Sequence, residues 1–151
     1  MKKQLKLTLL SCLLSIPAIT QAGPKDDIYR KGWIDFNKNG KMDIYEDPSA
    51  PIEERVKDLL SQMNMDEKTC QMATLYGSGR VLADALPTEK WKSEIWKDGI
   101  GNIDEEHNGL GKFGSEYAFP YAKHVKAIHD IQRWFVEETR LGIPVDFTNE
   151  G

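Results

Sequence analysis

The feature that most constrains the fold is a long amphipathic segment that runs directly into a short apolar one. From about residue 121 to residue 140, apolar residues recur at helical spacing and predict one long helix. Gly142 is the predicted stop of this helix, and Pro144 is tolerated where the next strand begins. That strand places Asn149 and Glu150 at its carboxyl end, where parallel β/α proteins bind their ligands. The expected buried face of the helix comprises Val125, Ile128, Ile131 or Gln132, and Phe135.

The first 22 residues have the pattern of a secretory signal peptide. Lys2 and Lys3 precede an apolar run that is too short and too interrupted to span a membrane, and Thr20-Gln21-Ala22 is a small-x-Ala cleavage site. Cys12 raises the alternative of a lipoprotein, but the apolar run continues beyond it. We therefore expect cleavage after Ala22 and a periplasmic or secreted product with no membrane association.

Charge and cysteine content exclude several classes of protein. Cleavage removes three lysines and no acidic residue, so the formal net charge falls from −4 to −7. An acidic chain without a basic cluster is a poor partner for nucleic acid. Cys70 is the only cysteine outside the signal segment, and its apolar neighbours predict a small buried side chain rather than a nucleophile.

A polar leader spans residues 23–48 and contains a calcium-loop pattern. Its twelve-residue segment, residues 35–46, has oxygen-bearing side chains and a glycine at the positions where an EF-hand loop requires them. Position 7 of that template uses a main-chain carbonyl. The predicted metal ligands are Asp35, Asn37, Asn39, Lys41, Asp43 and Glu46, with Gly40 at the sharp turn.

The helices that flank an EF-hand loop are missing from this pattern. Gly32 breaks the approach, and Pro48 follows Glu46 almost at once. An Asx-rich surface turn, in which the side chains satisfy their own backbone, is the alternative interpretation. The pattern thus predicts a structural calcium site rather than a calcium switch, and no organic cofactor is expected.

The region after the leader predicts helices and short strands. A first helix begins near residues 49–51, with Ile52, Val56, Leu59, Leu60 and Met63 on one apolar face. Asn64 and Glu67 form a capping box at the start of a second helix. Strands are expected near residues 70–76 and 99–103, and a polar helix over residues 87–98. The acidic residues 104–106 and His107 are interpreted as a solvated loop, and His124 and His129, five residues apart, as an unsuitable zinc pair.

Three motifs in this order resemble glycoside hydrolase family 3. They are Arg55-Val56-Lys57-Asp58-Leu59-Leu60-Ser61-Gln62-Met63 with the following Asp66-Glu67-Lys68 and Gln71-Met72; Gly99-Ile100-Gly101; and Val136-Glu137-Glu138-Thr139-Arg140-Leu141-Gly142-Ile143-Pro144. The leader also resembles a segment that precedes these helices in some members, so the resemblance covers about residues 29–151. The segment between Gly77 and Trp96 is only loosely similar to the family.

The resemblance implies an α/β fold in which residues 49–151 are the first portion of a (β/α)8 barrel, incomplete in this chain. It also implies retaining hydrolysis of β-linked glucosides or xylosides by two carboxyl groups. The nucleophile and the acid/base lie beyond this region in the family, so we assign no catalytic residue and expect the 151-residue chain alone to be inactive. By the same resemblance, Glu150 stands where the family normally has an aspartate that binds hydroxyls of the cleaved sugar. Glutamate is one methylene longer and leaves the sugar preference open, and a polar strand end without a ligand is the alternative interpretation.

Two hypotheses from different classes remain at this point. The first is the N-terminal part of a secreted β-glycosidase that acts on an oligosaccharide or β-glycoside. The alternative is a small secreted calcium-binding module that acts through interactions and uses the loop at residues 35–46. The alternative leaves the long helix and the segment that follows it unexplained.

Overall fold

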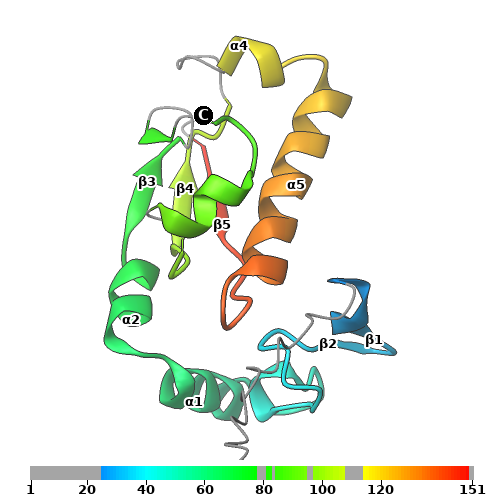
Figure 1. Cartoon of the computed structure of the whole chain (residues 1–151). Helices are drawn as coiled ribbons and strands as arrows, with labels where there is room; N and C mark the ends of the chain where they lie inside the picture. The colour runs from blue at the N-terminus through cyan, green and yellow to red at the C-terminus, as the bar shows by residue number, and fades with distance from the viewer. Residues whose placement is uncertain (1–24, 78–80, 83, 95–96, 108–113, 150–151) are drawn as a thin grey trace, which may run out of the picture.

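The computed structural model describes residues 25–77, 81–82, 84–94, 97–107 and 114–149 as a mixed α/β fold (Figure 1). In chain order the elements are η1 (Lys25–Ile28), β1 (Tyr29–Arg30), β2 (Trp33–Ile34), η2 (Ile44–Glu46), α1 (Ile52–Gln62), α2 (Met65–Gln71), β3 (Thr74–Tyr76), η3 (Glu89–Ser93), β4 (Asn102–Asp104), α4 (Gly114–Tyr117), α5 (Tyr121–Glu138) and β5 (Asp146–Thr148). No helix in these ranges has the length and apolar character needed to cross a bilayer.

The central sheet is parallel and follows the chain in the order β3-β4-β5. A separate antiparallel ribbon joins β1 to β2. The three parallel strands form a small open sheet, so the described residues contain no closed barrel. In the sequence, helix α5 comes between β4 and β5, and it leads into β5 as the helix–strand pattern predicts. In space, it lies along this sheet (Figure 1).

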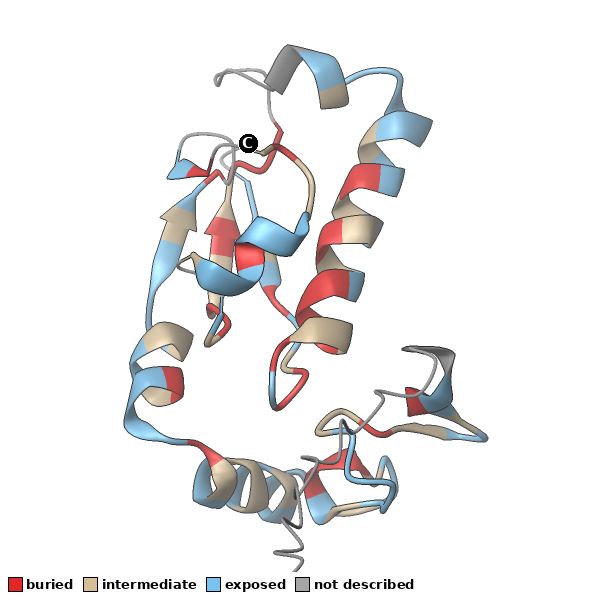
Figure 2. Cartoon of the chain, viewed as in Figure 1, coloured by how far each residue is buried: buried red, intermediate tan, exposed pale blue. Residues whose placement is uncertain are grey.

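The core lies between α5 and the sheet. Ile131 and Phe135 of α5 are fully buried against Ile103 of β4 and Trp91 of η3. Figure 2 shows the buried residues gathered along the side of α5 that faces the strands. Trp91 and Trp134 pack edge to face, with ring centroids 5.4 Å apart, an arrangement that adds to the stabilisation from apolar burial.

The start of α2 follows the predicted capping box. The backbone N–H of Glu67 donates to Asn64 Oδ1 over 2.8 Å, and the N–H of Asn64 donates to Glu67 Oε2 over 2.9 Å. Two of the amide groups that a helix start leaves without partners are satisfied in this way. The sequence prediction for this element is confirmed.

Several details differ from the sequence predictions. Helix α5 ends at Glu138, so Gly142 lies beyond the C′ position; its φ of 57° turns the chain where an added Cβ would meet Phe36 O at 2.7 Å. Val125 belongs to the N-terminal part of α5 and is exposed rather than buried. Among the described residues of the predicted helix at 87–98, regular structure is confined to the short 3-10 turn η3, which Thr88 caps and which ends at the extended Glu94.

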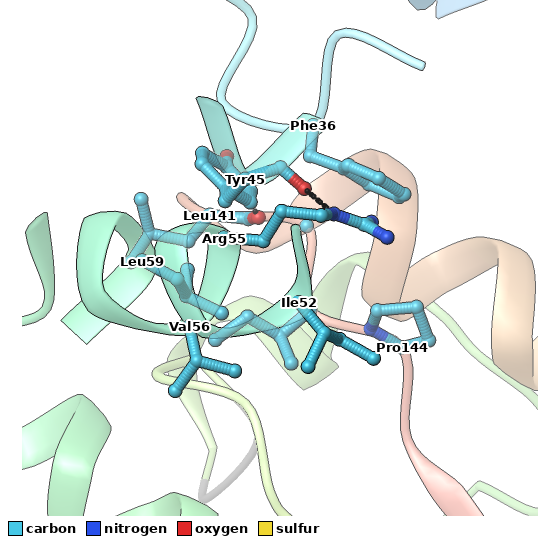
Figure 3. Close-up of a pocket in the computed structure, with 10 residues that line it drawn as sticks. Phe36, Tyr45, Ile52, Arg55, Val56, Leu59, Leu141 and Pro144 are labelled. Atoms are coloured by element: carbon cyan, nitrogen blue, oxygen red, sulfur yellow. Dashed lines mark hydrogen bonds between the residues drawn. The ribbon is translucent and has the colours of Figure 1, made fainter. Parts of the chain in front are cut away.

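The apolar face of α1 is present but uncovered. Ile52, Val56 and Leu60 are exposed, and only Met63 of the predicted face is buried. Beside this helix lies a cavity of about 340 Å³, drawn in Figure 3. It is lined by Phe36, Tyr45, Ile52, Arg55, Val56, Leu59, Leu141, Gly142, Ile143 and Pro144.

Candidate functional site

The two faces of the parallel sheet differ in chemistry. The central residues Leu75, Ile103 and Phe147 pair across the three strands and pack with the core that contains α5. Because side chains alternate along a strand, the flanking residues project from the opposite face. They form a lower row of Thr74, Asn102 and Asp146, and an upper row of Tyr76, Asp104 and Thr148 at the carboxyl ends of the strands.

Hydrogen bonds join the residues of these two rows. Asn102 Nδ2 donates to Asp146 Oδ2 over 3.3 Å in the lower row. In the upper row the Thr148 hydroxyl lies 2.8 Å from Asp104 Oδ1, and it lies 3.2 Å from Asn102 Oδ1 of the lower row. A hydroxyl has one proton to donate, so the shorter contact to the Asp104 carboxylate is the favoured hydrogen bond.

Three ionisable residues directly follow β4 and are buried, contrary to the prediction of a solvated loop. Glu105, Glu106 and His107 are all less than 8% exposed. The Glu105 N–H extends the sheet by donating to Thr148 O over 2.9 Å. His107 Nε2 lies 3.0 Å from Glu106 Oε1, a contact that becomes an ion pair only when the imidazole is protonated. Burial lowers the pKa of His107, although the Glu106 carboxylate opposes this shift.

The predicted calcium loop folds back on itself. The Asp35 carboxylate accepts hydrogen bonds from the backbone of Asn39 and Gly40, over 3.0 and 2.8 Å. The Glu46 carboxylate, at the other end, accepts from the backbone of Asn37 and Asp43. Asp35 and Glu46 are nearly fully buried, so both carboxylates are held inside the loop rather than in solvent.

The donor set of this loop is chemically suited to a hard cation. Carboxylate and amide oxygens are calcium's preferred ligands. In this structure the side-chain nitrogens of Asn37 and Asn39 donate to Asp43 Oδ2, and their Oδ1 oxygens accept from the backbone N–H groups of Asn39 and Lys41. Nowhere in the described residues do three His, Cys, Asp or Glu side chains gather closely enough to hold a metal ion. A bound calcium would therefore have to draw the Asp35, Asp43 and Glu46 carboxylates together.

The first family-like motif anchors this loop. Arg55 Nε of α1 donates to Tyr45 O over 3.1 Å, and Asp58 Oδ2 accepts from the Tyr45 N–H over 3.0 Å. Gln62 Oε1 accepts from Asn37 Nδ2 over 3.3 Å. Three polar residues of one helix thus hold the loop, which explains their spacing in the sequence.

Lys38 joins the same loop to the end of α5. Its ammonium donates to Val136 O over 2.9 Å and to Thr139 O over 2.6 Å, besides Phe36 O in its own loop. Val136 lies in the last turn of α5 and Thr139 is its C-cap residue. Carbonyl groups at a helix end lack intrahelical N–H partners, and a cation is favourable there.

The remaining predicted residues have different outcomes. Glu150 lies outside the described residues. Cys70 is half-buried rather than enclosed, because its neighbours Met65 and Met72 point into solvent. Burial nevertheless raises the pKa of its thiol, which disfavours the reactive thiolate. The ring of His124 lies 6.5 Å from that of His107, a contact that sequence spacing could not indicate.

Comparisons with known proteins give one distant relative. A protein of Formosa agariphila described as "Putative beta-xylosidase" is 32% identical to this chain over 109 residues, which are 70% of this chain and 13% of the relative. No protein-family profile matches the sequence. The chain thus spans about an eighth of the length of the curated relative that it matches, and the similarity relates it to a glycoside hydrolase without fixing the family.

Proposed function

We propose that this chain is the N-terminal part of a secreted or periplasmic glycoside hydrolase of family 3. The similarity over 109 residues to a protein described as a β-xylosidase carries the proposal. Three parallel strands in sequential order, with a long helix on one face, are consistent with the start of a (β/α)8 barrel. Residues 1–22 would be the signal peptide, residues 23–48 the leader, and residues 49–151 the first part of the barrel.

The proposed chemistry is retaining hydrolysis of a β-xyloside or β-glucoside. Two carboxyl groups about 5–5.5 Å apart would serve as nucleophile and acid/base through a covalent glycosyl-enzyme. The nucleophile would come from a later barrel strand and the acid/base from further along the chain, both beyond residue 151, whereas Glu150 would bind sugar hydroxyls. The described residues would then form part of the barrel that positions the active site and would not include its reacting groups.

Hydrolysis by the native secreted product tests this proposal. The protein should be isolated as the cell exports it and assayed with p-nitrophenyl β-xyloside and β-glucoside. We expect release of nitrophenol with retention of the anomeric configuration, and no turnover by the isolated 151-residue chain. A native product that cleaves neither substrate would refute the enzymatic function.

We further propose that the loop at residues 35–46 is a structural calcium site. Two observations support this proposal. The carboxylates of Asp35 and Glu46 point into the loop and accept hydrogen bonds from its backbone, and the loop is hydrogen-bonded to α1 and to the end of α5. This attachment favours a site within a larger fold over the alternative of a separate calcium-binding module. Isothermal titration should detect calcium binding that Glu46→Gln abolishes; equal binding by the variant would refute the site.

A further inference from the structure

We propose that Asp104 and Thr148 form a contact for sugar hydroxyls on the sheet face opposite α5. This inference rests on the proposed glycosidase function and names two substrate-binding residues within the described part of the chain. The first argument comes from their placement. Asp104 ends β4 and Thr148 ends β5, and they are paired in register on neighbouring parallel strands. Their side chains therefore stand together at the sheet edge where β/α enzymes bind substrate.

The polarity of this face needs an explanation. Parallel sheets are normally covered on both sides, and their strands are therefore apolar on both faces. Barrel interiors are filled mainly by branched aliphatic side chains. Here the face opposite α5 carries the carboxylates Asp104 and Asp146 with Asn102 and Thr148. An apolar cover would desolvate two carboxylates at a high cost in free energy, so this face must meet water or a polar ligand.

The upper row has hydrogen-bonding capacity left for a ligand. Asp104 Oδ1 accepts from Thr148, whereas Oδ2 accepts no hydrogen bond from any residue that the structure describes. The Thr148 oxygen, having donated its proton, can still accept one from outside. An open carboxylate oxygen beside an open hydroxyl oxygen matches two neighbouring hydroxyl groups, which are the defining feature of a pyranose ring.

The same geometry disfavours a metal ion as the ligand. No three acidic, histidine or cysteine side chains gather at this place or elsewhere in the described ranges. Asp104 and Asp146 belong to different rows, and the carboxylate of Asp146 is engaged by the amide of Asn102. A single carboxylate flanked by a hydroxyl suits a neutral polyol better than a divalent cation, which requires several oxygen ligands.

Sugar binding by the native secreted product tests the assignment. The parent, Asp104→Asn and Thr148→Val are titrated with xylose and with glucose by isothermal calorimetry. Asp146→Asn is the matched control, because it removes a carboxylate from the lower row of the same face. Melting temperatures show whether each variant folds, and Thr148→Val carries the test if Asp104→Asn does not.

We expect Asp104→Asn to weaken binding of the preferred sugar at least about tenfold, since it loses a charge-assisted hydrogen bond. Thr148→Val should weaken it severalfold, and Asp146→Asn should bind like the parent. Parent-like affinity in both upper-row variants would overturn the assignment, as would a parent that binds neither sugar. Glycoside hydrolysis together with unchanged affinities would refute the contact alone, whereas selective loss of binding in a product that hydrolyses nothing would refute only the enzymatic function.

Discussion

The guanidinium of Arg140 binds the carboxylate of Glu67 through two nitrogens, although 73 residues separate them in the chain. Arg140 Nε lies 2.8 Å from Glu67 Oε1, and Nη2 donates to Glu67 Oε2 and to Gln62 O. Glu67 also caps the start of α2 with Asn64. One buried carboxylate therefore joins the start of α2 to the segment after α5, and with it two of the three family-like motifs.

Replacing Arg140 by lysine tests this link. The charge is kept, but the two-nitrogen geometry and the bond to Gln62 O are lost. We expect a loss of about 1–3 kcal/mol in the free energy of unfolding, measured by denaturant titration. Arg133→Lys is the control, because Arg133 pairs with Glu137 one helical turn away and its two nitrogens reach a single carboxylate oxygen, Oε1. Loss of such a local pair should cost about 0.5 kcal/mol or less. Equal losses in both variants would show that the link is unimportant.

The same pair predicts how acid affects stability. Burial raises the pKa of Glu67, but the bonds from Arg140 and from the Asn64 N–H outweigh it and leave the pKa below its ordinary value. As the pH falls, Glu67 is therefore protonated in the unfolded state at a higher pH than in the folded state. The stabilisation is complete above the ordinary pKa of the carboxyl group and is lost as the pH falls through its folded-state pKa. Melting temperature against pH should therefore fall more steeply for the parent than for Glu67→Gln. Parallel curves would contradict this prediction.

Gly101 is required by a close approach of two backbones. A Cβ added at this residue would lie 2.2 Å from the carbonyl oxygen of Gln71, and the Gly101 N–H donates to Cys70 O. Gly101→Ala must therefore separate α2 from the start of β4, at a cost of about 2–3 kcal/mol. Gly32→Ala is the comparison. A Cβ added at Gly32 would meet no atom within 4 Å, so this substitution is disfavoured only by the positive φ of the residue. Thermal unfolding of both variants measures the difference; a smaller loss for Gly101→Ala would contradict the model of close contact.

Lys38 is expected to hold the end of α5. Lys38→Met keeps the length of the side chain and removes the donor to the carbonyls of Val136 and Thr139. We expect a loss of about 1–2 kcal/mol and faster amide hydrogen exchange in the last turn of α5. Lys41→Met is the matched control, because Lys41 is exposed in the same loop. Unchanged exchange in α5 would show that the contact does not stabilise the helix.

Local patterns in the sequence predicted the elements whose signals are local. The capping box at Asn64 needs only residues three positions apart, and α5 needs only its own apolar spacing, so both were found. The strand before Gly77 and the one after Ile100 were also placed to within a few residues. The calcium-loop residues were identified by spacing alone, and their occupancy stays a prediction.

Features that depend on distant contacts were not predictable. Burial of Glu105, Glu106 and His107 arises because β5 and α5 close around the end of β4, which no local pattern encodes. The polar rows became visible only once the register paired Asp104 with Thr148. Conversely, the apolar face of α1 was identified correctly as a pattern, but the described residues provide no cover for Ile52 and Val56.

The central claim is that these residues begin a larger glycoside hydrolase, and the intact mass of the native secreted product tests it most directly. Mass spectrometry with peptide mapping should find a protein several times heavier than 17.2 kDa, the mass of the chain, with peptides that continue past Gly151. A mass equal to that of residues 23–151 would contradict the claim. The glycosidase relation would then be one of ancestry, and the loop at residues 35–46 would become the leading candidate for the function of the chain.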